Sequence, residues 1–399
     1  SRQCSDREKC GVIIMAFSEM HSRTLTVFLF STILGAMPSG LTAAPKISDA
    51  YLDDSGDVII TGSKFGNGPT VAIHDDFSNA EVGDDTVSLS PKVGKWLISN
   101  SNSNQIVIDE KHGSKSLFVR GNGSSRFVFG IPDESGPQGL RTFQEVYLSY
   151  TIKDLGEFPG ANGTSSDFSN QSATKDAWMM LGDRGDNTEY AVSKGDASGH
   201  DLYIPGWTGG GFNIAGNNTR MNPSFWQGGL TENWVFGGWH TKMFHAELDP
   251  ADPYGAAQGF FAFLNRDAYQ VNVRNGNFME DQRSEGVPYP FWDRIKFFAW
   301  MNTGDADVKR VVDEIYVAIG DNANARVLVT DNQSLNRSTR VFHLSPQSWT
   351  DSEIVARFPD YLPDSNSYFL HVIDASNDNS ASFGLCQSCP NPPQVFQVE

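Results

Sequence analysis

The stretch Arg294-Ile295-Lys296-Phe297-Phe298-Ala299-Trp300-Met301-Asn302 alternates between two kinds of side chain and decides the fold class. Its odd-numbered positions, from Ile295 to Met301, are all apolar. A period of two is the period of a β-strand, because successive side chains of a strand point to opposite faces. The stretch therefore predicts a strand whose odd-numbered face lies on a core. The even-numbered face carries Lys296, Phe298, Trp300 and Asn302.

Similar segments recur along the chain, separated by turns rich in Gly, Asn, Asp and Ser, whereas helix signals are scarce. Many of these segments alternate with period two. This pattern predicts an all-β architecture of packed antiparallel sheets, a sandwich or jelly roll. The predicted strands include Val58–Thr61, Gln105–Asp109, Ser116–Arg120, Arg126–Phe129, Val146–Lys153, Ala177–Leu181, Lys242–Leu248, Gly259–Leu264, Ile295–Met301 and Val311–Ile319.

The composition excludes several classes of protein. The chain has 399 residues, of which 27 are Phe and 9 are Trp, and this aromatic content argues against disorder. The formal net charge is −18, and a field of that sign repels a phosphate backbone, so no nucleic-acid partner is expected. The 4 Cys are too few for a miniature domain stapled by disulfides. An acidic, glycine-rich and cysteine-poor chain is typical of an extracytoplasmic β-protein.

Residues 1–44 have the layout of upstream residues followed by a secretory signal peptide. A short basic region with Arg23 precedes an apolar run, 25–36, and a small-residue exit that ends at Ala43-Ala44. The run is shorter than the roughly 20 residues that a membrane-spanning helix needs. We therefore expect a secreted or extracytoplasmic protein, cleaved after Ala43 or Ala44, with no transmembrane segment in the mature chain. A buried helix is the alternative.

Residues 386–399 form a proline-rich tail that contains Cys386-Gln387-Ser388-Cys389. Such a CxxC pair occurs in redox-active sites and as half of a zinc site. No thioredoxin-like pattern surrounds this pair in the sequence, and the mature chain has no second pair to complete four ligands. We therefore favour a local disulfide formed in an oxidising compartment.

Two distant parts of the chain carry the strand and turn pattern of one small domain. The first is Gly56-Asp57-Val58-Ile59-Ile60-Thr61-Gly62-Ser63-Lys64-Phe65-Gly66. The second comprises Ala325–Val329, Ser348–Ala356 and Ser367–Asp374. Together they resemble the opening and closing halves of the immunoglobulin-like IPT/TIG family. The resemblance implies an Ig-like domain divided between 45–74 and 320–385, with a second domain inserted into one of its loops. The alternative is two unrelated β-segments.

The residues between these halves, 75–319, begin with Asp75-Asp76-Phe77-Ser78-Asn79 and end with Val312-Asp313-Glu314-Ile315-Tyr316-Val317. Trp239-His240 and a strand that ends in Asn265 lie between them. These features resemble the concanavalin A-like lectin/glucanase superfamily. The resemblance implies an all-β protein in which a concanavalin A-like jelly-roll sandwich is inserted into a small Ig-like β-sandwich. It supports a fold more than an activity.

Three acidic residues indicate a structural calcium site. Asp75, Asp76 and Asp313 meet if the first and last strands of the jelly roll pair with each other. Ca²⁺ takes hard oxygen ligands such as carboxylates and backbone carbonyls. Carbohydrate-binding jelly rolls that the chain resembles often place a structural Ca²⁺ between these segments. The alternative is that the three carboxylates are solvated turn residues, which an acidic chain has in abundance.

The aromatic residues have two candidate uses, a core and a sugar groove. Aromatic rings stack on the apolar faces of sugars while polar neighbours bind hydroxyl groups, and the even-numbered face of 294–302 mixes both kinds of residue. The aromatic-rich segment 182–238 has little strand pattern and is a candidate wall of such a groove. The alternative is that both faces of the strand are buried. The predicted substrate-binding residues are Trp178, Trp207, Trp239, Lys296, Phe298, Trp300 and Asn302.

The sequence leaves catalysis open. The paired carboxylates of laminarinase-like glycosidases are absent, because Asp313 and Glu314 are adjacent and point to opposite faces of a strand. A polysaccharide lyase needs a base, an acid and a group that neutralises a uronate carboxylate. His240 and Lys242 share one face of their predicted strand, and His245 lies on the other. A structural role for each histidine is the alternative. The candidates for a lyase are His240, Lys242, His245, Arg274 and Tyr289.

The sequence therefore predicts a secreted carbohydrate-binding protein that recognises extracellular polysaccharide through an aromatic-lined groove. The enzyme alternative is a polysaccharide lyase acting by β-elimination on a uronate polymer, and the negative net charge counts against it. The third alternative is a non-catalytic structural or adhesive cell-surface module. Structural Ca²⁺ is the expected cofactor.

Overall fold

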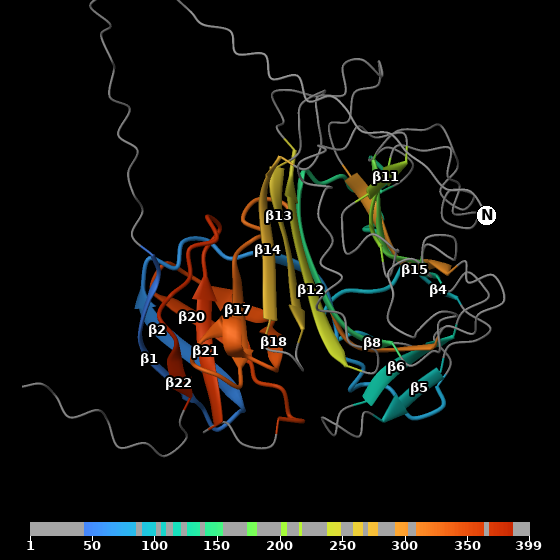
Figure 1. Cartoon of the computed structure of the whole chain (residues 1–399). Coiled ribbons are helices and arrows are strands. Elements are labelled where there is room, and N and C mark those ends of the chain that lie inside the picture. The colour runs from blue at the N-terminus through green and yellow to red at the C-terminus, as the bar shows by residue number, and fades with distance from the viewer. Residues whose placement is uncertain are drawn as a thin grey trace, which may run out of the picture. The chain divides into compact units, whose positions relative to one another are not determined.

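A computed structural model of the chain confirms the predicted all-β architecture. No α-helix occurs in the ranges that it describes, and their strands form four antiparallel sheets (Figure 1). The signal-like residues 1–43 and the Cys386–Cys389 pair lie outside these ranges. The described residues are 44–84, 90–100, 105–108, 115–120, 126–135, 140–154, 174–181, 201–205, 215–217, 238–248, 258–265, 270–277, 292–301, 309–362 and 367–385.

Two four-stranded sheets share one core, and we call them the terminal sandwich because they combine the first and last described strands. The first sheet is β1 (Lys46–Leu52), β2 (Asp57–Ser63), β20 (Glu353–Arg357) and β19 (Pro346–Trp349). The second is β18 (Val341–Leu344), β17 (Arg326–Thr330), β21 (Tyr368–Ile373) and β22 (Phe383–Leu385). A short 3₁₀ helix, Leu335–Arg337, lies between β17 and β18.

Pairing between β2 and β20 joins segments almost 300 residues apart. The register runs from Asp57 opposite Arg357 to Thr61 opposite Glu353. The buried positions of both strands alternate, and they meet the second sheet in one apolar cluster. Gly62 has no room for a side chain, because a Cβ there would lie 2.0 Å from the carbonyl oxygen of Lys46. The distant segments therefore fold as one unit, while their IPT/TIG likeness stays a prediction.

Two larger sheets form the central sandwich. One is six-stranded, in the order β11 (Ala215–Asn217), β10 (Asp201–Pro205), β9 (Thr174–Leu181), β15 (Trp292–Met301), β7 (Arg126–Phe129) and β4 (Ile98–Asn100). The other is eight-stranded, in the order β14 (Gln270–Asn277), β13 (Gln258–Asn265), β12 (Trp239–Glu247), β8 (Glu145–Asp154), β16 (Lys309–Ile319), β6 (Lys115–Arg120) and β5 (Gln105–Ile108), with β3 (Thr70–Asp75) paired to β16. The strands β10 and β11 fall within 182–238, where the sequence shows little strand pattern.

The core of the central sandwich lies between its two sheets, and β15 follows the predicted alternation at Ile295 and Phe297 but not at Phe298. Ile295 and Phe297 of β15 belong to this core, as predicted for the odd-numbered face. Phe298 belongs to it as well and is fully buried, although the alternation places it on the opposite face. Its φ is 54°, and the pairing with β9 shifts register between Phe297 and Trp300. This β-bulge turns an even-numbered side chain inward.

The second face of the eight-stranded sheet packs on the terminal sandwich. Tyr147, Met243 and Tyr316 of the central sandwich share an apolar cluster with Leu328 and Val341 of the terminal sandwich. Figure 1 shows β17 and β18 near β13 and β14, in agreement with this cluster. The two sandwiches are therefore joined by a buried apolar contact rather than by a linker alone.

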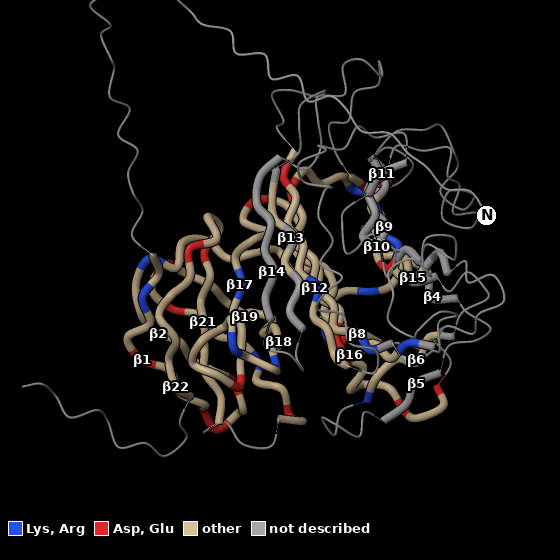
Figure 2. The backbone as a smooth tube through the Cα atoms, in the orientation of Figure 1, with Lys and Arg blue, Asp and Glu red and all other residues tan. Residues whose placement is uncertain are grey.

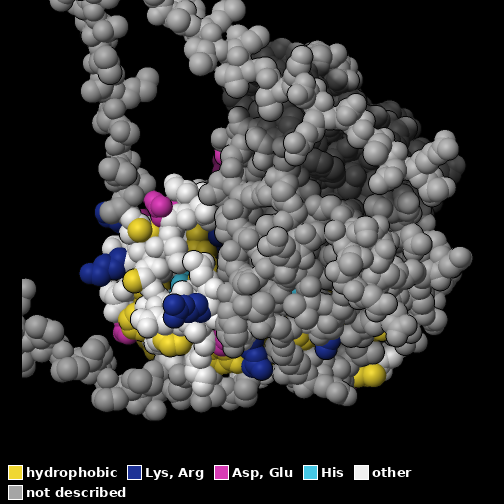
Figure 3. All heavy atoms as spheres, viewed as in Figure 1, with side chains coloured by type: hydrophobic (Ala, Val, Ile, Leu, Met, Phe, Trp, Pro, Cys, Tyr) yellow, Lys and Arg dark blue, Asp and Glu magenta, His cyan; other side chains and the backbone are white. Residues whose placement is uncertain are grey.

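Charge is distributed evenly over the described strands. Figure 2 shows acidic and basic positions interspersed along both sandwiches. On the face drawn in Figure 3, the described Lys and Arg side chains stand as separate spots rather than as one patch. In the described part of the chain, no helix has the length and apolar character needed to span a membrane.

Candidate functional site

Two of the predicted sugar-binding positions, 178 on β9 and 296 on β15, lie on the face of the six-stranded sheet that points away from the core. Lys296 is fully buried, and its neighbours Ile295 and Phe297 lie in the inter-sheet core. Because alternate residues of a strand point to opposite sides, Lys296 projects to the other face of the sheet. Position 178 on β9 lies directly opposite Lys296, and position 203 on β10 lies opposite position 178. The structure thus aligns Tyr203, Trp178 and Lys296 across three strands.

A second buried cation lies two residues before Lys296. Arg294 is 2% exposed, and its guanidinium donates to both oxygens of the Asp293 carboxylate, at 2.7 Å from Nε and 2.8 Å from Nη2. A bidentate pair of this kind fixes the plane of the guanidinium. The face therefore carries two buried cations, and Arg294 is held in place by Asp293, its neighbour in the sequence.

The remaining predicted groove residues do not all join this row. Trp300 lies on β15 opposite Lys175 of β9, and Phe298 points into the inter-sheet core. Trp239 is 1% exposed at the start of β12 in the other sheet, with the Lys153 ammonium 5.7 Å from its ring centroid. Trp207 and Asn302 lie outside the described residues.

A charged cluster bridges the two sheets at one end of the core. The carboxylate of Asp176 on β9 forms ion pairs with Lys242 of β12, at 2.5 Å, and with Arg310 of β16. The hydroxyl of Tyr150 on β8 donates to the same carboxylate at 3.3 Å. The three charged side chains have no solvent exposure. Four strands of the central sandwich therefore meet at one buried carboxylate.

The ion pairs keep this carboxylate charged. Burial raises the pKa of an isolated carboxyl group. At Asp176 the positive charges of Arg310 and Lys242, together with their hydrogen bonds, outweigh burial and hold the pKa below its usual value. The Lys242 ammonium also lies 5.6 Å from the ring centroid of Tyr150. The cluster is thus an ionised, fully desolvated group of side chains.

The predicted lyase residues separate into two faces of β12, as the alternation indicates. Lys242 points into the inter-sheet space, on the same side as Phe244, and His240, two residues before it, is fully buried. On the other side, Nε2 of His245 lies 3.0 Å from the Glu145 carboxylate. Register carries Arg274 of β14 to Phe261 of β13 and from there to Phe244. The side chain of Arg274 and the whole of Tyr289 lie outside the described residues.

The predicted calcium ligands lie where the first and last strands of the central sandwich pair. Asp75 lies opposite Ile315 of β16 and accepts hydrogen bonds from the Phe77 amide, at 3.0 Å, and from Nε1 of Trp96, at 2.8 Å. Burial raises its pKa to about 6 despite these hydrogen bonds. Asp313 lies on β16, where its carboxylate is 3.5 Å from the Ser116 hydroxyl.

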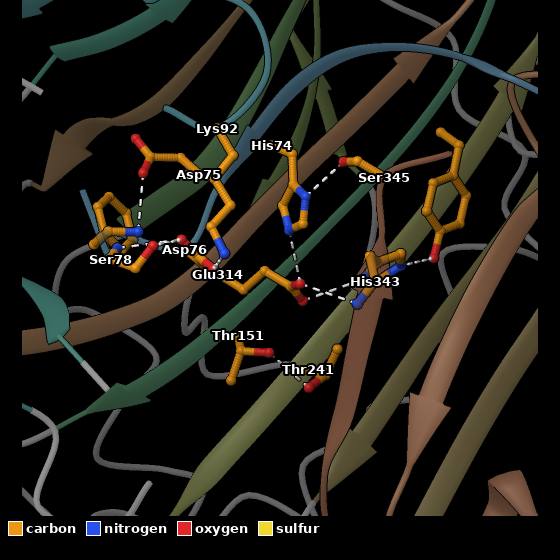
Figure 4. A network of polar contacts seen from close by, with 12 residues as sticks. His74, Asp75, Asp76, Ser78, Lys92, Thr151, Thr241, Glu314, His343 and Ser345 are labelled. Atoms are coloured by element: carbon orange, nitrogen blue, oxygen red, sulfur yellow. Dashed lines mark hydrogen bonds and ion pairs between the residues drawn. The ribbon is translucent and has the colours of Figure 1, made fainter. Parts of the chain in front are cut away.

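Asp76 is held by donors of its own chain. Its carboxylate accepts from the Ser78 hydroxyl at 2.7 Å and pairs with the Lys92 ammonium at 2.5 Å (Figure 4). Within the described ranges no three His, Cys, Asp or Glu side chains form a group that could hold a metal ion. Donors thus occupy the oxygens of Asp75 and Asp76, and calcium stays a prediction that a chelator-sensitive melting temperature would test.

A second buried carboxylate, Glu314 of β16, lies at the contact between the sandwiches (Figure 4). It receives the backbone N–H of His343 at 3.0 Å, and its oxygens lie 3.2 Å from Nδ1 of His343 and 3.2 Å from Nε2 of His74. Burial alone raises the pKa of Glu314, but the interactions with His343 and His74 outweigh it and lower the pKa. Two imidazoles from different strands thus converge on one carboxylate.

Sequence reasoning missed the partners of these two carboxylates. It identified Lys242 but not Asp176, Tyr150 or Arg310, which come from three other strands. One signal was available: Lys242 shares its strand face with Phe244 and Ala246, and a cation on an apolar face requires a buried partner. No local pattern identifies which acidic residue that partner is.

Comparisons by sequence give no match to any protein family or curated protein. Among solved structures, the chain is similar to a cellulose-induced protein, Cip1, with 15% identity, 62% of this chain and 99% of that chain covered, and a TM-score of 0.34. It is also similar to the alginate lyase of family PL-14 from Aplysia kurodai, with 11% identity, coverages of 54% and 87%, and a TM-score of 0.31. A third similar structure is the lectin UEA-II in complex with galactose. It has 10% identity, coverages of 67% of this chain and 100% of that chain, and a TM-score of 0.30. Likenesses this remote carry no conclusion about function.

Proposed function

We propose that the protein binds a polysaccharide on the outer face of the six-stranded sheet. The observation that carries this proposal is the row formed by Tyr203, Trp178 and Lys296, which runs across β10, β9 and β15 opposite the core. A row of aromatic positions perpendicular to the strands suits an extended chain of sugar rings, because each ring offers an apolar face for stacking. The jelly-roll resemblance of the sequence supports the same function.

Within the row we assign different parts to the three residues. Lys296 is fully buried, so we assign it to positioning rather than to direct contact with the sugar. The bidentate pair of Arg294 with Asp293 holds the same face rigid two residues away. We assign sugar stacking to positions 178 and 203. Positioning and stacking only bind the sugar, so the proposed function needs no catalytic group.

The test is binding of the mature protein to a panel of neutral and acidic polysaccharides, by glycan array and affinity electrophoresis. We expect Trp178→Ala to weaken binding by at least about fivefold, since loss of a stacked aromatic typically costs about 1 kcal/mol or more. Tyr51→Ala is the matched control, because Tyr51 is an aromatic residue of the terminal sandwich that is 47% exposed. Unchanged binding by Trp178→Ala, or binding to no glycan of the panel, would overturn the assignment.

A polysaccharide lyase is the second candidate, and the Asp176 cluster is the observation that favours it. Lys242, Tyr150 and Arg310 meet at one carboxylate, and His240 lies two residues from Lys242 on the same strand. Cations and a phenol of this kind could neutralise a uronate and move its proton. We place this candidate second because the cluster has no solvent exposure.

The lyase is tested with a panel of uronate polymers, by following the ultraviolet absorbance of the unsaturated product. A signal that disappears in Lys242→Met while binding persists would favour the lyase. Binding without any such product in the wild type would leave the lectin-like function alone.

A further inference from the structure

The contact between the two sandwiches has an apolar part and a polar part. The apolar part packs Tyr147 and Tyr316 of the central sandwich against Leu328 and Val341 of the terminal sandwich. The polar part centres on His343 of β18, which lies between Val341 and the end of its strand and has no solvent exposure. A buried imidazole in the middle of an interface makes that interface depend on its protonation state.

One neutral tautomer of His343 satisfies every contact of its ring. Nδ1–H donates to the Glu314 carboxylate at 3.2 Å, and Nε2 accepts from the Tyr147 hydroxyl at 2.9 Å. The ring stacks on Tyr316 with centroids 4.5 Å apart and an interplanar angle of 24°. A second proton on Nε2 would face the Tyr147 hydroxyl hydrogen, so Tyr147 would have to turn it away. An uncharged ring therefore satisfies both contacts without a change at Tyr147.

His74 has the same arrangement on the other side of Glu314. Its Nε2 lies 3.2 Å from the carboxylate, and its Nδ1 lies 2.6 Å from the Ser345 hydroxyl, one residue beyond β18 (Figure 4). Nε2–H therefore donates to Glu314, and Nδ1 accepts from Ser345. Both imidazoles thus bridge a strand of the central sandwich to the segment that contains β18.

The titratable groups around His343 come from four strands. Arg326 is the nearest cation of the terminal sandwich, and its guanidinium lies 4.7 Å from the ring centroid of Tyr147. It donates to the side chains of Asn324 and Asn377, which are neutral. Its charge therefore disfavours a second cation nearby. The groups are Glu314 and Tyr316 of β16, Tyr147 of β8, His74 of β3 and Arg326 of β17.

Burial lowers the pKa of His343, and it outweighs the opposite effect of the Glu314 charge. A histidine with a lowered pKa binds its proton less readily in the docked state than in an exposed state. Docking is then fully favoured above the ordinary pKa of about 6.5 and is weakened as the pH falls below it. The sign agrees with the neutral tautomer that satisfies both contacts.

We propose that His343 is a pH-sensitive latch between the two sandwiches: its neutral imidazole holds β18 against the central sandwich, and its protonation releases that contact. The proposal is independent of carbohydrate binding, because it concerns the face of the eight-stranded sheet that packs on the terminal sandwich. We expect the latch to open locally, since the hydrogen bonds found for Glu314 in the described part of the chain go to His74 of β3 and His343 of β18.

Hydrogen–deuterium exchange of the whole protein tests the latch, with labelling times corrected for the intrinsic effect of pH on exchange. We expect protection of 341–344 to fall by up to about tenfold for each pH unit below about 6.5, while 353–357 stays protected. In His343→Asn, which keeps a donor toward Glu314 but does not titrate, protection should fall less with pH than in the wild type. Tyr147→Phe should also make the fall smaller, because the neutral ring loses its donor and the pKa of docked His343 moves back toward its ordinary value.

His245→Asn is the control, because His245 is a second interface histidine and its partner is Glu145 rather than Glu314. It should keep the wild-type fall. Protection of 341–344 that is independent of pH in the wild type, or a fall in His343→Asn as large as in the wild type, overturns the proposal. Nitrogen NMR of the wild-type protein reports the protonation state of the His343 ring directly, without any substitution. We expect a neutral Nδ1–H ring at neutral pH, and a ring already doubly protonated there also overturns the latch.

Discussion

Asp176 and Glu314 are both buried carboxylates of the central sandwich, but they are neutralised in different ways. Asp176 faces two permanent cations, Lys242 and Arg310, inside the core. Glu314 faces the imidazoles of His74 and His343 at the contact with the terminal sandwich. The first arrangement keeps its charges at every physiological pH, whereas the second changes where histidine titrates. We call Asp176 with Lys242 and Arg310 the permanent lock, because its charges join the two sheets at every such pH. We call Glu314 with His74 and His343 the conditional lock, because its contacts between the sandwiches depend on the titration of histidine.

The largest effect is expected at the permanent lock. Asp176→Asn leaves Lys242 and Arg310 buried without their counter-charge, and removal of one partner from a buried ion pair costs about 3–5 kcal/mol. We expect the free energy of unfolding in urea to fall by that amount. A loss below about 1 kcal/mol would show that the charges are satisfied without Asp176 and would remove the contrast with Glu314.

A pH effect of similar size is expected at His371 of β21, on the face of its sheet that carries Leu328 and Ile373. Burial lowers the pKa of His371 to about 4, and its Nε2 contacts the Thr330 hydroxyl at 3.1 Å. The unfolded state takes up the proton near pH 6.5, so the stability due to the neutral ring is complete above that pH. It is lost as the pH falls toward 4, by up to about 3 kcal/mol.

His371→Gln should flatten this part of the stability curve, measured by urea unfolding at several pH values. The fall of protection at 341–344 should persist in that variant, which distinguishes the effect of His371 on β21 from that of His343 on β18. An acid slope unchanged from the wild type would place the responsible group elsewhere.

A smaller effect is expected at the conditional lock. Glu314→Gln keeps the shape and one acceptor but removes the charge, and hydrogen bonds to charged groups contribute about 1.5–3 kcal/mol. We expect a loss of about 2 kcal/mol at neutral pH, less than for Asp176→Asn because the partners of Glu314 are imidazoles rather than permanent cations. Glu353→Gln is the matched control, since Glu353 is an exposed residue of β20, and it should change stability by less than about 0.5 kcal/mol.

Much of the strand order could be predicted because alternation is a local property. Arg126–Phe129 is predicted with the bounds of β7, and Tyr368–Ile373 lies within a segment recognised from its sequence. The failure at Phe298 has a physical cause: a β-bulge changes the face of a residue without any change in the apolar pattern. Two further strands, β10 and β11, were missed because their segment lacks alternation.

The candidate sites likewise have one part that could be predicted from the sequence and one part that could not. The separation of His240 and Lys242 from His245 follows from strand geometry alone, and the structure shows the same separation between the two faces of β12. Alignment of Trp178 with Lys296 depends on the register of two strands more than 100 residues apart, which no local signal contains. The same holds for the strands that meet at Asp176.

The sequence by itself determined that this chain is all-β and which residues alternate, and it predicted that two distant segments are the halves of one small domain. These properties depend on neighbours along the chain. The tertiary structure alone decided that β2 pairs with β20, that Asp176 neutralises Lys242 and Arg310, and that His343 docks on Glu314. Each of these depends on the free energy of burying a charge or a strand edge next to one particular distant partner, and that partner is defined only when the chain has folded.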